Sequence, residues 1–254
     1  MFRFLIITIV AVLSFTEAKA SNEEFVPETL GDVQKRLRLE HAQELLGRHY
    51  AKSLVRNGEN IKRINSQIYR WTRERLPARY RKEHAKIAQT IIDESLKYGF
   101  DPVFLLSVIQ SESRFNPDAR GGHGEIGLMQ ILPPTGSWIA EKAGIKWRGP
   151  NTLKDNVANI KLGAAYFAFL RDRFDMHARL YIAAYNMGQR NVDLALDKKI
   201  WPKDYPGIVM KNYVDFYSSL GVSTGVTAGA ATATTANEAL SSPNGETSAQ
   251  MASR

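Results

Sequence analysis

Apolar residues recur at helical spacing through most of the chain's first two hundred positions. The clearest N-terminal series are Leu30, Val33 and Leu37, then Leu46, Tyr50 and Leu54, then Ile61, Ile64, Ile68 and Trp71. Residues three, four or seven positions apart share one face of a helix, so these series predict an N-terminal helical region. No stretch shows sustained two-residue alternation, which would be typical of strands. The pattern therefore predicts a mainly α fold with little or no sheet.

The middle of the chain carries signals for two consecutive helices. The first is predicted over 82–98, with Gly99 as its stop, and its packed side is formed by Ala88, Ile91, Ile92 and Ser95. Asp101 then reads as an N-cap, with Pro102 at the first helical position of the next helix. That helix is predicted to end at Asn116-Pro117.

Beyond this pair, loops and then further helices are expected. Gly121, Gly122, Gly124, Gly127 and three prolines within 116–136 predict loops and a short hairpin. A helix over 156–174 is apolar on most sides, which indicates that other helices enclose it. Another helix is predicted over 177–187, with Gly188 as its stop.

The two ends of the chain differ from its middle. Arg3, the apolar run 4–15 and Ala18-Lys19-Ala20 are typical of a cleaved secretory signal, and the run is shorter than a bilayer span. We expect a periplasmic or secreted protein cleaved near Ala20. The last thirty or so residues are rich in Thr, Ala, Gly and Ser, and we expect them to be disordered. The predicted parts are a signal peptide (1–20), a basic helical region (21–85), a second helical domain (86–220) and a disordered tail (221–254).

Positive charge is concentrated in one segment of a basic chain, whose net charge is +8. Between Lys62 and Lys86, Glu74 and Glu83 are outnumbered by nine basic residues: 62, 63, 70, 73, 75, 79, 81, 82 and 86. Such a stretch favours an anionic polymer as partner, although a solvated helix face explains it equally well. Export argues against nucleic acid, so anionic envelope polymers or membrane surfaces are the expected partners.

Several kinds of chemistry find no support in the sequence. The chain has no cysteine, so it carries neither a disulfide framework nor an N-terminal lipidated Cys, and we expect no lipoprotein. The glycines of 121–127 are not followed by the Lys-Ser/Thr of a phosphate-binding loop. The five histidines form no helical pair with an acid between them. We therefore predict no metal and no cofactor.

Glu112 is a carboxylate at a position where a soluble helix usually has a core residue. Ile109, Val108 and Leu105 precede it by three, four and seven positions, so all four side chains share an apolar face. Burial disfavours the charged form, and the C-terminal end of the helix dipole adds to this effect, so the pKa of Glu112 should be raised. A carboxylic acid that stays protonated near neutral pH can act as a general acid.

Several motifs accompany this acid in a fixed order. Glu112-Ser113-x-Phe115-Asn116-Pro117 is followed by Gly127-Leu128-Met129-Gln130, Asn159-Ile160-x-x-Gly163, Ala184-Tyr185-Asn186 and Tyr213-Val214. This series, spanning 87–220, resembles the soluble lytic transglycosylase (SLT) catalytic domain of the lysozyme-like superfamily. Gly121 and Glu125 depart from the family's usual Ser and Ala, which bears on substrate contacts.

The resemblance implies a lysozyme-like helical domain that cleaves the bond between N-acetylmuramic acid (MurNAc) and N-acetylglucosamine (GlcNAc) in peptidoglycan. Glu112 would be the only acid and base, and a 1,6-anhydro ring would form without water as the nucleophile. The resemblance also assigns substrate contacts to Ser113, Met129, Gln130, Tyr185, Asn186 and Tyr213. For Ser113, capping of the helix end fits the sequence equally well. We expect Tyr213 to pair with Glu112, since a buried phenol needs a hydrogen-bond partner.

Two other functions remain open. A hydrolase similar to the goose lysozymes would deliver water to the same bond, with Glu125 or Asp118 as the nearby candidates for a second carboxylate. A non-catalytic wall-binding component of an envelope assembly would use the basic helices and the tail for contacts.

Overall fold

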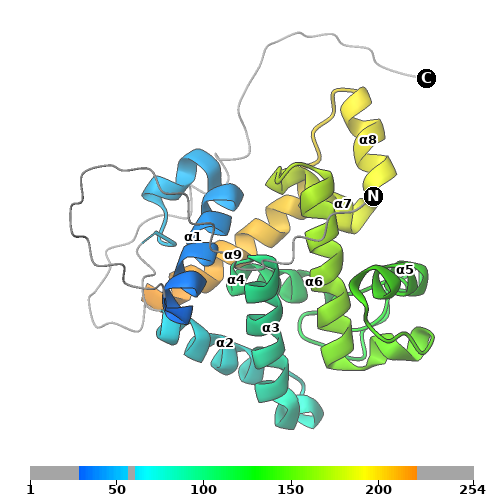
Figure 1. Cartoon of the computed structure of the whole chain (residues 1–254), viewed down its shortest axis with the longest axis horizontal. Coiled ribbons are helices and arrows are strands. Elements are labelled where there is room, and N and C mark those ends of the chain that lie inside the picture. The colour runs from blue at the N-terminus through cyan, green and yellow to red at the C-terminus, as the bar shows by residue number, and fades with distance from the viewer. Residues whose placement is uncertain (1–28, 57–60, 222–254) are drawn as a thin grey trace, which may run out of the picture.

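The computed structural model describes residues 29–56 and 61–221, and these residues are mainly helical (Figure 1). The helices are α1 Leu30–Leu46, η1 Gly47–Lys52, α2 Ile61–Arg75, η2 Ala78–Glu83, α3 His84–Tyr98, α4 Pro102–Ser113, α5 Pro133–Ala143, η3 Pro150–Lys154, α6 Asn156–Arg173, α7 Ala178–Met187, α8 Gln189–Asp197 and α9 Asp204–Gly221. The described residues contain isolated β-bridges but no named strand. The mainly α prediction is confirmed. The predicted signal peptide and nearly all of the predicted tail lie outside the described residues.

The helix pair in the middle of the chain follows its sequence signals closely. Gly99 ends α3 in the left-handed conformation with φ 67°, and the predicted packed side of α3 is buried. The Asp101 side chain accepts a hydrogen bond from the Val103 amide at 2.9 Å and caps α4. Pro102 begins the helix. Local chemistry therefore fixes where α4 starts.

α4 is the central helix of the molecule (Figure 1). Every residue from Val103 to Ile109 is buried. α9 packs along it, and α3 and α2 also contact it. A helix enclosed in this way holds the position of its last turn, where Glu112 lies.

The N-terminal helices share the core with the rest of the chain. Ile64, Ile68 and Trp71 of α2 are buried, as their spacing predicts. α1 forms as predicted, but Leu30 is 67% exposed, and the buried side chains of α1 are Arg38, His41 and Ala42. The spacing of apolar residues therefore predicts the wrong buried face for α1. The buried face carries polar groups, and these have hydrogen-bond partners in the core.

The second half of the fold is partly predicted. α6 and α7 match the predicted segments to within one residue at each end. The structure also contains α5, α8 and α9, for which the sequence analysis predicts no helix. The expected loop at 116–136 ends early, because Pro133 begins α5. Antiparallel bridges join Ile126 to Arg120 and to Ile131, in place of the predicted hairpin.

None of the helices that the structure describes combines the length and the apolar character needed to cross a membrane.

Candidate active site

Glu112 is the next-to-last residue of α4, and it lies where the helix leaves the core. Leu105, Val108 and Ile109 on its face are fully buried, whereas Glu112 is partly exposed. The helix ends at Ser113 rather than at the predicted Asn116-Pro117, because Arg114 and Phe115 adopt positive φ angles of 51° and 63°. Such conformations cost energy in non-glycine residues and are found at functional sites. The turn leaves Glu112 at the edge of the apolar interior.

The pKa of Glu112 is set by three influences. Together they raise it from the usual 4.5 to about 7, and burial is the largest cause. The Tyr205 hydroxyl donates a hydrogen bond to Oε1 of Glu112, which lowers the pKa, and the negative charge of Glu125 raises it. Near neutral pH, the group is therefore divided between an acid that can donate a proton and a carboxylate that can accept one.

The loop 126–130 lies beside Glu112 and is held from beneath by buried hydrogen bonds. The Ser113 hydroxyl donates to the Leu128 carbonyl at 2.8 Å. Asn159 is fully buried, accepts from the Met129 amide at 2.8 Å and donates to the Ile126 carbonyl at 2.8 Å. Ser113 therefore joins the end of α4 to this loop. Of the two roles that the sequence left open for Ser113, this contact fits a role at the helix end better than a contact with substrate.

Two glycines allow this loop to approach α6. A Cβ on Gly163 would lie 2.3 Å from Met129 Sδ, and a Cβ on Gly127 would lie 2.6 Å from Asn159 Nδ2. Gly127 also has φ 83°, which disfavours a side chain. Met129 is fully buried against Gly163, so it supports the floor of the site.

Tyr185 joins the same group from α7. Its hydroxyl donates to the Met129 carbonyl at 2.7 Å, and its ring stacks on Phe167 with centroids 4.0 Å apart. The Glu112 charge adds to burial in raising the pKa of Tyr185, so the two groups are neighbours. Asn186 follows at the exposed end of α7.

The remaining predicted residues are placed differently from expectation. The pairing of Tyr213 with Glu112 is wrong: Tyr213 is fully buried and donates to Asp101 Oδ2 at 2.7 Å, while Tyr205 occupies the position at Glu112. This placement keeps Tyr213 inside the core. The Gln130 side-chain amide donates to the Ala119 and Gly127 carbonyls at 3.1 and 2.8 Å, so it braces the loop.

Neither candidate for a second carboxylate shares the environment of Glu112. Asp118 pairs with Arg79 and accepts from the Tyr80 hydroxyl at 2.7 Å, and these contacts lower its pKa. Glu125 accepts from the His123 amide at 2.9 Å, and its pKa is also lowered. Both are therefore ionised at neutral pH, whereas Glu112 is divided between its protonated and ionised forms.

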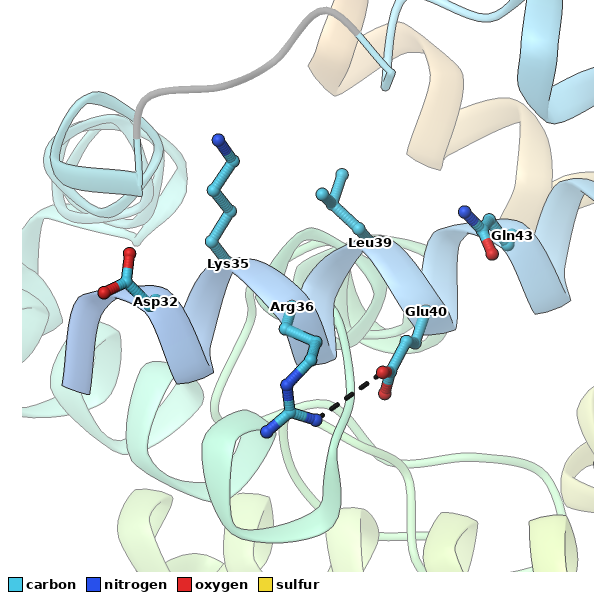
Figure 2. Close-up of a pocket in the computed structure, with 6 residues that line it drawn as sticks. All are labelled: Asp32, Lys35, Arg36, Leu39, Glu40 and Gln43. Atoms are coloured by element: carbon cyan, nitrogen blue, oxygen red, sulfur yellow. Dashed lines mark ion pairs between the residues drawn. The ribbon is translucent and has the colours of Figure 1, made fainter. Parts of the chain in front are cut away.

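A cavity of about 370 Å³ lies along α1 and contains none of the predicted site residues (Figure 2). Its walls are Asp32, Lys35, Arg36, Leu39, Glu40 and Gln43. All six come from one helix. Asp32 belongs to the α1 capping box, and Glu40 pairs with Arg36 at 3.5 Å. This groove therefore offers no acid comparable to Glu112.

Comparison with known proteins identifies the region around Glu112. Residues 89–206 match the family model described as the transglycosylase SLT domain. The chain contains an SLT domain. The match covers α4, the 126–130 loop, Tyr185 and Tyr205, so the groups gathered around Glu112 belong to this SLT domain.

Relatives of this SLT domain occur in bacteria and in a phage. A membrane-bound lytic murein transglycosylase C of Serratia proteamaculans is 34% identical over 135 residues, which are 49% of this chain and 37% of that protein. A transglycosylase of Enterobacteria phage PRD1 is 33% identical over 126 residues, covering 49% of this chain and 42% of that protein. A solved lytic transglycosylase Slt of Pseudomonas aeruginosa is 29% identical, with TM-score 0.48, over 52% of this chain and 24% of that one. The chain thus matches less than half the length of these proteins.

Sequence reasoning missed Tyr205 as a site residue of the SLT domain. Tyr205 follows the first residue of α9, Asp204, and Pro206 comes next, so its surroundings are typical of a helix start. No local signal distinguishes it from Tyr213. Asn159 belongs to the motif Asn159-Ile160-x-x-Gly163, but its support of the loop depends on contacts 30 and 33 positions away.

Proposed function

We propose that this protein is a peptidoglycan lytic transglycosylase that cleaves the MurNAc-GlcNAc bond and leaves 1,6-anhydro-MurNAc ends. The observation that carries the proposal is a single carboxyl group, Glu112, whose pKa of about 7 lets it donate and accept a proton within one SLT domain. The relatives named as lytic murein transglycosylases support the same activity. Peptidoglycan glycan strands are the proposed substrate.

The reaction needs a proton to move in two directions. Protonated Glu112 gives its proton to the glycosidic oxygen as the bond to the MurNAc anomeric carbon breaks, and the GlcNAc hydroxyl leaves. The resulting Glu112 carboxylate then takes the proton of the muramic 6-hydroxyl while that oxygen bonds to the anomeric carbon. The acid is regenerated, and no water is consumed. The Tyr205 hydroxyl stabilises the intermediate carboxylate, because its hydrogen bond favours the charged form.

A hydrolase is the alternative that a specific observation supports. Glu125 is ionised and close enough to influence Glu112, so it could activate water as a general base. Against this role, its carboxylate is engaged by the His123 amide. The transglycosylase reaction needs only one carboxyl group, so it fits Glu112 in its apolar surroundings better than the hydrolase reaction does.

Product mass separates these functions. Purified sacculi digested with the wild-type chain should release muropeptides that are one water lighter than reducing-end products. Products of full mass would indicate a hydrolase. Binding to sacculi without release, by wild type and Glu112→Gln alike, would indicate the wall-binding component. Glu141→Gln, which changes an exposed acid on α5, serves as the matched control and should retain full release.

We also propose that the basic segment 62–86 holds anionic envelope polymers near the site after export to the periplasm. Arg81 and Lys82 are exposed on η2. Their neighbours Arg79 and Tyr80 contact Asp118, which lies in the segment that follows Glu112. This arrangement places η2 beside the loops of the SLT domain.

Exposed charges act through screened electrostatics, so salt is the appropriate probe. Arg81→Glu with Lys82→Glu should lower the amount of protein that sediments with sacculi at low salt and should remove most of the salt dependence. Lys198→Glu with Lys199→Glu, on the exposed segment after α8, is the charge-matched control. Equal losses in both variants would show that net charge, rather than η2, governs binding.

A further inference from the structure

A cluster of buried polar groups surrounds the carboxylate of Asp101 at the start of α4. Its Oδ2 accepts hydrogen bonds from Tyr213 at 2.7 Å and from Tyr217 at 2.6 Å. Arg38 of α1 donates to the Tyr217 hydroxyl at 3.0 Å. All four side chains are at most 3% exposed. A charge buried this deeply is costly unless it is fully paired, so these contacts must form together.

The cluster is one end of a longer series of contacts between α4 and α9. At the other end, Tyr205 donates to Glu112. A further contact joins the neighbour of Glu112 on α4 to the neighbour of Tyr213 on α9: Asn212 donates to the Ser111 hydroxyl at 2.9 Å. The first set of contacts joins the start of α4 to the C-terminal half of α9, and the last contact joins the end of α4 to the start of α9. Pairs at far-apart points of both helices therefore hold one helix on the other.

Contacts at both ends of α9 fix its position along α4. A slide of α9 by one residue would shift Tyr205 by about 1.5 Å along the axis and turn it by about 100°. Hydrogen bonds do not tolerate such a displacement. The Tyr205 contact with Glu112 therefore depends on where α9 is held at its far end, next to Asp101.

We propose that Asp101, Tyr213 and Tyr217 are positioning residues that lock the register of α9 on α4 and so keep Tyr205 on Glu112, with Arg38 of α1 completing the lock. The roles of Glu112 and Tyr205 rest on the proposed function. Through this register lock, α1, which lies outside the residues matched by the SLT model, would influence the active-site acid Glu112.

The direction in which the pKa of Glu112 moves when Asp101 is changed distinguishes a positioning role from a direct effect of the Asp101 charge. The groups that act on Glu112 are Tyr205, whose hydrogen bond lowers its pKa, and Glu125, whose charge raises it; Tyr185 is also a neighbour. A loosened lock weakens the Tyr205 contact, so the pKa of Glu112 should rise. Simple removal of the negative charge of Asp101 would instead lower the pKa of Glu112.

The test measures the pKa of Glu112 by carboxyl NMR titration of the full chain labelled at glutamate, a readout that needs no activity. Tyr217→Phe and Asp101→Asn should each raise this pKa by about half a unit to one unit. The same changes in a Tyr205→Phe background should add nothing, because the contact they disturb is already gone. An equal rise in both backgrounds, an unchanged pKa, or a fall would overturn the proposal.

Matched variants separate positioning from loss of stability. Tyr181→Phe removes another buried phenol hydroxyl, which contacts His41 of α1 at 3.0 Å but belongs to α7. It should leave the pKa of Glu112 unchanged. Arg38→Met should raise this pKa, and Arg38→Lys should restore part of the difference. If wild type releases no anhydro products while the titrations behave as described, the proposed function fails and the register lock stands.

Discussion

Tyr205 and Glu112 are 93 positions apart in the sequence, and the Tyr205 hydroxyl donates a hydrogen bond to the Glu112 carboxyl group. One residue comes from the first turn of α9 and the other from the last turn of α4. Burial favours the protonated form of Glu112, and this hydrogen bond favours the ionised form. The balance places the pKa in the range where both forms are available to a reaction.

Glu112→Gln should abolish muropeptide release and stabilise the protein at alkaline pH. The folded pKa of Glu112 lies above its unfolded value, so the stability it contributes is present below about 4.5 and is lost as pH rises through about 7. The rise corresponds to at most about 3 kcal/mol. Denaturant unfolding should therefore show the variant more stable by about 1 to 3 kcal/mol at pH 8, with little difference at pH 4. The opposite pH trend would contradict the assigned environment.

Tyr205→Phe and Glu125→Gln should move the activity profile in opposite directions. Loss of the Tyr205 hydrogen bond raises the pKa of Glu112 above about 7, whereas loss of the Glu125 charge lowers it. Hydrogen bonds to charged groups contribute about 1.5 to 3 kcal/mol, so the first shift should reach about one unit or more. The alkaline limb of kcat against pH reports both shifts. Tyr69→Phe, in α2, is the control that should leave this limb in place.

Gly163→Ala should damage the floor of the site. The added methyl group would lie 2.3 Å from Met129 Sδ in a fully buried position, so either α6 or the loop must move. Overpacking of this kind costs about 1 to 3 kcal/mol, and release should fall along with stability. Gly122→Ala meets no atom within 4 Å and should be nearly neutral. Equal melting temperatures for the two variants would show that the contact with Met129 is not needed.

Asn159→Ala should destabilise the protein more than most single changes. It removes the buried acceptor of the Met129 amide, a loss that costs about 1 to 3 kcal/mol. It also removes one of two donors to the Ile126 carbonyl, which keeps the Ile131 amide at 3.1 Å. Thermal unfolding and KM should both change, because the loop that borders Glu112 loses its support. Asn151→Ala, at an exposed position of η3, is the control. A KM equal to that of wild type in folded Asn159→Ala would remove the loop from substrate binding.

The sequence predicted features that depend on nearby residues. Asp101, Pro102 and Gly99 define the ends of α3 and α4 through cap chemistry, which operates within one helical turn. The raised pKa of Glu112 was predicted because its apolar neighbours lie on the same helix. Such signals stay readable without knowledge of how the helices pack.

Features that depend on how distant helices pack were not predictable. Tyr205 and Tyr213 both belong to α9, and only the register of α9 on α4 decides which of them contacts Glu112. The buried face of α1 carries Arg38 and His41, and hydrophobic spacing gives no weight to such residues. Their partners are Tyr217 and the Asp101 amide, 179 and 60 positions away.

The paired Asp101 carboxylate also bears on how this protein can be divided. A fragment trimmed to 89–206 would keep Asp101 but lose Arg38, Tyr213 and Tyr217. An unpaired anion would then remain in an apolar interior, a situation that proteins avoid by unfolding or by taking up a proton. Recombinant versions of the catalytic part should therefore begin before Leu30 and extend through Leu220, however short the recognisable homology is.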